Sequence, residues 1–172
     1  MRKFGANGFT LMEVMITVVI VAILAGIAYP TYTRFVAETR RSDATIALSQ
    51  LAAQQEKFFT DCGGYAGGIG VGPGRVCPPA LGSPAGTIDT ATVSINAGGI
   101  TREGHYQITI TPGPTGTLAT SYTLTATPTP LSTQALNDSL KCTTIVLDST
   151  GVKLATGTEA STGPNGGRCW KK

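Results

Sequence analysis

An apolar stretch at residues 9–29, FTLMEVMITVVIVAILAGIAY, limits what this chain can fold into more than any other part of its sequence. At a helical rise of about 1.5 Å per residue, roughly twenty such residues can cross a bilayer core about 30 Å thick. Glu13 lies inside the stretch, although an ionised carboxylate is costly in hydrocarbon unless it reaches the interface or a partner. The sequence therefore predicts a membrane-spanning helix in which Glu13 has a specific purpose.

The polar residues before this stretch differ from an ordinary secretory signal. Arg2 and Lys3 supply the positive charge, but the best small-residue cleavage site, Gly8, precedes the apolar stretch instead of following it. Cleavage after Gly8 would leave the hydrophobic helix on the mature protein. Because positive residues stay on the cytoplasmic side, Arg2 and Lys3 also predict that everything after residue 29 faces outward.

The four cysteines, Cys62, Cys77, Cys142 and Cys169, all lie beyond the apolar stretch. An even number of cysteines in an outward-facing segment favours two disulfides formed in an oxidising compartment such as a bacterial periplasm. Three connectivities are possible. We favour Cys62–Cys77 and Cys142–Cys169, because pairing near neighbours closes one loop each, which stabilises the fold by about 3 kcal/mol per loop. A zinc site is disfavoured, because no CxxC occurs and the single histidine is far from every cysteine in sequence.

Charge and composition exclude several classes of function. The chain has 172 residues, which suits one domain plus its N-terminal segment, and its net charge of +3 comes from scattered residues without a basic stripe. His105 alternates with apolar residues and is expected on the exposed face of a strand. Asp138, Asp148 and Glu159 are isolated and show no calcium-loop pattern. We therefore expect no catalytic activity, no cofactor and no metal site.

A long helix should continue from the apolar stretch to about residue 60. Gly26 and Pro30 mark a weak point in it, because proline removes one backbone hydrogen bond and favours a kink. Beyond Pro30 the apolar residues become one-sided, and those expected to cover a sheet are Ala44, Ala47, Leu48, Leu51 and Phe58. The polar residues expected to face elsewhere are Arg40, Arg41, Asp43, Gln54 and Lys57. A charged cluster just past the apolar stretch forms either a solvated collar at the membrane surface or contacts between subunits, and its residues are Arg34, Glu38, Arg40, Arg41 and Asp43.

The C-terminal part alternates in the manner of β-strands. Residues 62–85 are rich in Gly and Pro and are expected to form an irregular connector tied by a disulfide. Strands are predicted at residues 90–95, 105–111 and 121–126, followed by a hairpin of residues 143–148 and 152–154. The predicted fold class is α+β, with one long N-terminal α-helix packed on an antiparallel β-sheet of four or five strands. Four segments are predicted. They are a leader at residues 1–8, the transmembrane half of the helix at 9–30, its amphipathic half at 31–60 and a disulfide-bearing β domain at 61–172.

The motif Gly8-Phe9-Thr10-Leu11-Met12-Glu13, followed by an apolar helix and Ala28-Tyr29-Pro30, resembles the class III signal and N-terminal helix of type IV pilins. The close resemblance covers about residues 8–60. It implies that a prepilin peptidase cleaves after Gly8 and methylates the new terminal amine of Phe9. It also implies a purpose for Glu13, whose carboxylate would neutralise that buried amine in the same or a neighbouring subunit.

The same resemblance implies the partners and the location of the protein. The chain is expected to polymerise with other pilins, starting in the lipid of the inner membrane with the assembly machinery and ending in a surface pilus used in adhesion, twitching motility or DNA uptake. Helix near Gly26 and Pro30 either keeps a fixed kink or is lost on assembly. Residues 40–44 and 55–59 loosely resemble minor pilins of the fimbrial-biogenesis E type. The alternatives are a type II secretion pseudopilin, and a minor pilin whose loops or tail bind DNA or a surface.

The C-terminal tail leaves two interpretations open for its tryptophan. Trp170 is either an anchor for a binding partner or a residue packed over the tail, and Lys171 and Lys172 give weak support for binding to DNA or another anionic surface.

Overall fold

A computed structural model describes residues 9–70, 77, 86–88, 90–91, 93–96, 98–130, 132, 134–135, 141–160 and 166–170. The chain forms two compact units, Met1–Val36 and Ala37–Lys172. Gly8 and the rest of the predicted leader lie outside the described residues, as does most of the predicted connector. Helix α1 (Leu11–Cys62) contributes its first half to the first unit and its second half to the second unit.

The first half of α1 is apolar and exposed on all sides. Leu11 is 77% exposed, Tyr29 is 74% exposed and Phe35 is 67% exposed. The most apolar window of the helix has a mean hydropathy of 2.6, and none of that window is buried within the protein. By length and composition, this helix can cross a membrane. Side chains of this kind are stable only against lipid or against other apolar helices.

Pro30 lies inside α1, and the helix continues through it. Since proline has no N–H, the carbonyl of Gly26 does not receive the usual bond from the residue four positions later. The Thr31 hydroxyl donates to the Ile27 carbonyl at 3.2 Å, which gives the next carbonyl a side-chain partner. The helix is therefore weakened here without being interrupted, and its loss on assembly stays a prediction.

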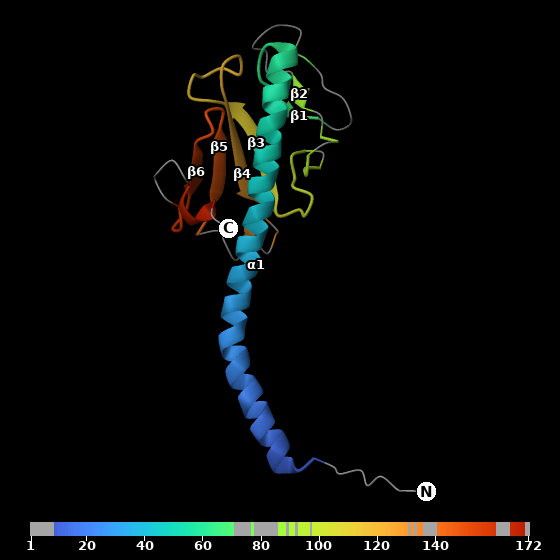
Figure 1. The fold of residues 1–172 in the computed structure, drawn as a ribbon, viewed down its shortest axis with the longest axis vertical. Coiled ribbons are helices and arrows are strands. Elements are labelled where there is room, and N and C mark those ends of the chain that lie inside the picture. Colours follow the sequence, from blue (N-terminus) through green and yellow to red (C-terminus); the bar gives the residue numbers. More distant parts are fainter. Residues whose placement is uncertain are drawn as a thin grey trace, which may run out of the picture. The chain divides into compact units, whose positions relative to one another are not determined.

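The second unit contains a four-stranded antiparallel sheet with the order β3-β4-β5-β6. The strands are β3 (Tyr106–Pro112), β4 (Tyr122–Pro128), β5 (Thr144–Asp148) and β6 (Lys153–Thr156). Figure 1 shows these strands beside the second half of α1. A parallel pair, β1 (Gly68–Ile69) and β2 (Thr87–Ile88), and a short 3-10 helix, η1 (Gly167–Cys169), complete the described elements. The predicted α+β class is thus confirmed.

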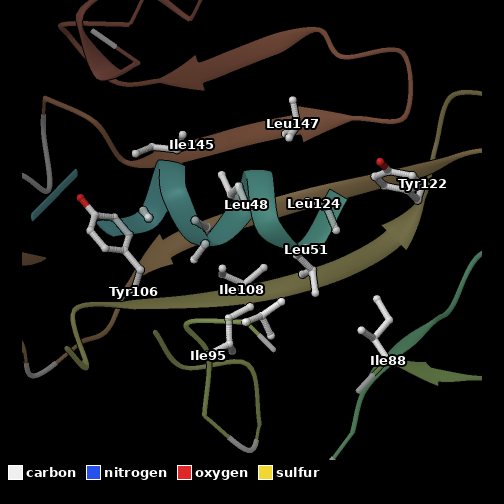
Figure 2. Packing of buried hydrophobic residues seen from close by; sticks show 14 of the residues in the cluster. Leu48, Leu51, Ile88, Ile95, Tyr106, Ile108, Tyr122, Leu124, Ile145 and Leu147 are labelled. Carbon is white, nitrogen blue, oxygen red and sulfur yellow. The ribbon is translucent and has the colours of Figure 1, made fainter. Parts of the chain in front are cut away.

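The hydrophobic core lies between α1 and this sheet. All the helix residues predicted to cover the sheet are buried, and they belong to one cluster with residues of β3, β4 and β5. Figure 2 shows Leu48 and Leu51 among Ile108, Leu124 and Ile145. The alternation within the strands supplies this face, because Tyr122 and Leu124 of β4 are buried while Thr123 between them is partly exposed. The predicted hairpin also forms, between β5 and β6.

Two predictions about the strands were wrong. Residues 90–95 form no regular strand among their described positions, although Val93 and Ile95 are buried as the alternation suggested. Their backbone has other partners, because Ser94 N–H donates to Gln50 Oε1 at 2.8 Å and Ile95 forms an isolated bridge with Thr101. The predicted connector also contains a regular piece, since β1 falls within it and pairs with β2.

Arg41 does not face away from the domain as predicted. Its side chain is buried, and Arg41 Nη1 lies 3.0 Å from Glu159 Oε2, so Glu159 is not isolated either. A buried guanidinium requires an opposite charge, and Glu159 supplies it from a loop 118 residues further along the chain. The pair therefore fastens the segment after β6 to the helix.

The structure contains two disulfides, Cys62–Cys77 and Cys142–Cys169, the pairing favoured from the sequence. The first links the end of α1 to the segment after β1. The second encloses β5, β6 and η1 in one covalent loop. The C-terminal tail is thereby tied to the start of β5, which counters the fraying expected of a chain end.

Gln55 is a buried polar residue that holds the turn after α1. Its Nε2 donates to the Ala66 carbonyl and its Oε1 accepts from the Ala66 N–H, each at 2.9 Å, so the amide imitates a backbone partner. Both Gln55 and Ala66 are fully buried. Without the amide, two buried backbone groups would have no partner.

We expect Gln55→Leu to lower the free energy of unfolding by about 3 kcal/mol, because a buried N–H and a buried C=O each lose a hydrogen bond. Urea unfolding of the full chain in detergent, with the disulfides intact, measures this change. The control is Gln107→Leu on the exposed face of β3, which should cost less than about 0.5 kcal/mol. A loss below about 1 kcal/mol for Gln55→Leu would show that the bonds to Ala66 matter little.

Candidate functional site

The start of α1 carries a helix cap that involves Thr10 and Glu13. The Glu13 N–H donates to the Thr10 hydroxyl at 3.2 Å, and the Val14 N–H donates to the Thr10 carbonyl at 3.2 Å. Thr10 is therefore the N-cap, and the sequence Thr10-Leu11-Met12-Glu13 has the spacing of a capping box. A carboxylate in the first turn also interacts favourably with the helix dipole.

The bond to Thr10 is made by the Glu13 backbone, so the Glu13 carboxylate contributes here through its charge in the first turn of α1. Both Phe9 and Glu13 are exposed, so both are accessible to a neighbouring helix. Phe9 immediately precedes the cap, so an amine created there would stand at the helix N-terminus, where a positive charge is unfavourable. A carboxylate nearby would offset that cost.

The only tryptophan of the sequence, Trp170, directly follows Cys169 of the second disulfide. Its indole Nε1 donates to the Leu154 carbonyl of β6 at 2.8 Å. Gly166 has a φ of 63°, and a Cβ built there would overlap the indole ring, so only glycine fits beside it. Of the two interpretations left open for Trp170, the structure supports packing over the tail.

Lys153 lies against the same indole, with Nζ 5.4 Å from the ring centroid. This distance is within the range of a cation–π interaction. Lys153 and Trp170, together with Thr45, Ile46, Ser49 and Gln50 of α1, line a shallow groove of about 320 Å³. We call these six residues the Lys153 groove. Its volume is at the lower end of the range for small-molecule or single-group binding sites.

A second group of titratable residues lies where α1 meets the loop before β3. Burial raises the pKa of Asp43, while the Thr101 hydrogen bond opposes that shift. Burial also lowers the pKa of His105, and the nearby Arg40 lowers it further. His105 is partly buried, just before the start of β3, instead of on an exposed strand face as predicted. Within the described residues, no cluster of His, Cys, Asp and Glu could hold a metal ion.

Sequence reasoning missed three of these features. The cap at Thr10 was detectable, because Thr-x-x-Glu before an apolar run is a recognised helix start. The Lys153 groove and the pair of Arg41 with Glu159 were not, because each joins α1 to residues more than a hundred positions away.

Two protein families match this chain. The family described as "Type IV minor pilin ComP, DNA uptake sequence receptor" matches residues 30–146, which is more than half of the chain. The prokaryotic N-terminal methylation motif matches residues 3–29. Together the two matches cover the exposed half of α1, its buried half and the sheet as far as β5.

Individual relatives are also pilus proteins. The type IV major pilin protein PilA of Myxococcus xanthus is 42% identical over 72 residues, which are 40% of this chain and 33% of PilA, so the match spans a third of that relative. The fimbrial protein EcpC of Eikenella corrodens is 33% identical over 109 residues, covering 59% of this chain and 71% of EcpC.

A solved type IV pilin structure from Shewanella oneidensis is similar with 20% identity and a TM-score of 0.36, covering 68% of this chain and 89% of that one. The family match over residues 30–146 and the methylation motif over residues 3–29 together identify the chain as a type IV pilin, belonging to the ComP minor pilin family.

Proposed function

We propose that the chain is a structural subunit of a type IV pilus and that it polymerises by packing its N-terminal helix against the helices of other pilins. The observation that carries this proposal is the first half of α1, which is apolar on all sides and has none of its most apolar window buried. Lipid would cover this surface before assembly, and neighbouring helices would cover it afterwards. The change of surroundings costs little, because lipid tails and apolar side chains are similar solvents.

In this proposal a prepilin peptidase removes residues 1–8 and methylates the amine of Phe9. Glu13 then supplies the negative charge for that amine as the subunit enters the filament, with its domain held in the periplasm and its helix in the inner membrane until then. A buried ion pair of this kind contributes more to register than to net stability. Pro30 and Gly26 would allow the helix to bend or lose local structure as the pilus assembly machinery extracts the subunit.

Glu13→Val should leave cleavage and membrane insertion intact and reduce sheared filaments by at least about tenfold, because the amine would lose its counter-charge. Glu13→Gln removes only the charge, since glutamine has a similar shape, is polar and also suits this position of a capping box. Mass spectrometry of sheared filaments and immunoblotting of the processed membrane form measure assembly and cleavage.

If the charge matters, Glu13→Gln fails to assemble as Glu13→Val does. Normal filaments from Glu13→Gln would show that the charge of Glu13 is not required. Absence of the unaltered chain from sheared filaments would remove the pilus subunit proposal and favour the secretion pseudopilin.

A second proposed activity is binding of DNA by the folded domain. It is favoured by the match of residues 30–146 to a family described as a DNA uptake sequence receptor. The net charge of +3 and the sequence Lys171-Lys172 at the C-terminus are compatible with a polyanion as partner.

The full processed chain in a neutral detergent should bind a short fluorescent duplex, with an affinity that falls linearly as the logarithm of salt concentration rises. The expected slope is about −0.9 for each phosphate contacted, because bound counterions are released. Fluorescence anisotropy over a salt series measures it. Binding no tighter than that of a protein with zero net charge in the same detergent would refute this activity.

A further inference from the structure

The residues that line the Lys153 groove have no part in the filament assembly proposed above. Lys153, which lies in the loop closed by the Cys142–Cys169 disulfide, and Trp170, which directly follows that loop, line one part of the groove. Thr45, Ile46 and Ser49 of α1 line another part. Lys153 and Trp170 lie beyond residues 30–146, so the family match does not include them. We propose that this groove receives the sugar–phosphate backbone of DNA, with Lys153 as the residue that contacts a phosphate. This inference rests on the DNA-binding activity proposed above.

The positive charge of Lys153 is oriented but not neutralised. The indole of Trp170 holds Nζ at 5.4 Å from the ring centroid, and the indole itself is fixed by its bond to the Leu154 carbonyl. Among the described residues, no carboxylate forms an ion pair with Lys153. A cation held by an aromatic ring keeps its full charge and its hydrogen-bond donors for a ligand, whereas a salt bridge would cancel the charge.

The other polar groups of the groove leave few donors besides Lys153. The Thr45 hydroxyl donates to the Ser42 carbonyl and the Ser49 hydroxyl donates to the Thr45 carbonyl, so both hydroxyl protons are used within the helix. Gln50 Oε1 accepts from the Ser94 N–H, so its Nε2 remains a donor. The groove therefore offers one cation and one amide donor, which suit the oxygen atoms of a phosphate.

The apolar part of the groove suits the sugar that accompanies each phosphate. Ile46 is 45% exposed on the helix side, and the partly exposed ring of Trp170 faces the groove from the other side. Deoxyribose presents apolar carbon atoms next to the charged phosphate, so it would cover both. Arg168, two residues before Trp170, adds a further exposed positive charge to this part of the chain. A DNA backbone fits this combination better than an acidic peptide does.

The test compares variants of the full processed chain in neutral detergent, with the same fluorescent duplex. Lys153→Gln should weaken binding about tenfold at roughly 0.1 M salt and reduce the salt slope by about 0.9, the effect of one lost phosphate contact. Lys57→Gln is the matched control, because it removes the same charge from an exposed position of α1 outside the groove. Ser49→Glu should weaken binding by introducing a negative charge, and Ala53→Glu on the next exposed turn is its control.

The single tryptophan provides a direct readout of the site, because Trp170 is the only indole and lines the groove. Binding of DNA should change its emission in the unaltered chain and in Lys57→Gln. The inference is overturned if DNA binds without changing this emission, if Lys153→Gln and Lys57→Gln bind equally well, or if polyglutamate displaces DNA at equal charge concentration. If the unaltered chain does not bind DNA, the proposed DNA activity fails, and this inference fails with it.

Discussion

The two halves of α1 need different surroundings, because the first half is apolar on its exposed surface and the second half packs on the sheet. The rest of the structure depends on this difference. Up to Val36 the surface of α1 is apolar on every side, whereas from Ala37 onward only one stripe is apolar and is buried. An all-round apolar helix needs lipid or other helices, and a one-sided helix needs a sheet. The strands, the disulfides and the polar loops are all attached to the one-sided half. The unburied half is therefore the part of the chain that must find its partners in another molecule.

Much of the fold was predictable because the periodicities are clear. The helical spacing of Ala44, Leu48 and Leu51 and the alternation in β3 and β4 both reflect burial on one face, and burial is what the structure shows. The same alternation misled at residues 90–95, where Val93 and Ile95 are buried without a regular strand. Alternation reports which side chains are buried, but it does not report whether the backbone pairs with a strand or, as at Ser94, with the side chain of Gln50.

The candidate sites also differ in how far they could be predicted from the sequence. The N-terminal motif is contiguous, so its residues could be named from the sequence, and the cap by Thr10 needed only the recognition of one local pattern. The Lys153 groove depends on a loop of the C-terminal region returning to the middle of α1, fastened there by the pair of Arg41 with Glu159 and by the second disulfide. When a charged residue and an aromatic residue are this far from α1 in the sequence, no spacing pattern predicts that they contact it. Trp170 was noticed, but its position over β6 and its contact with Lys153 required the structure.

Each edge of the four-stranded sheet is covered in part by other segments of the chain. Beside β3, the Ile108 N–H donates to the Gly99 carbonyl at 2.7 Å, and Ile100 bridges to Gln107. Beside β6, the Trp170 indole donates to the Leu154 carbonyl, and the strand has only four residues. Open edges in a crowded assembly invite strand addition from neighbouring copies and uncontrolled aggregation. A neighbouring pilin that added a strand at either edge would therefore first have to displace these contacts.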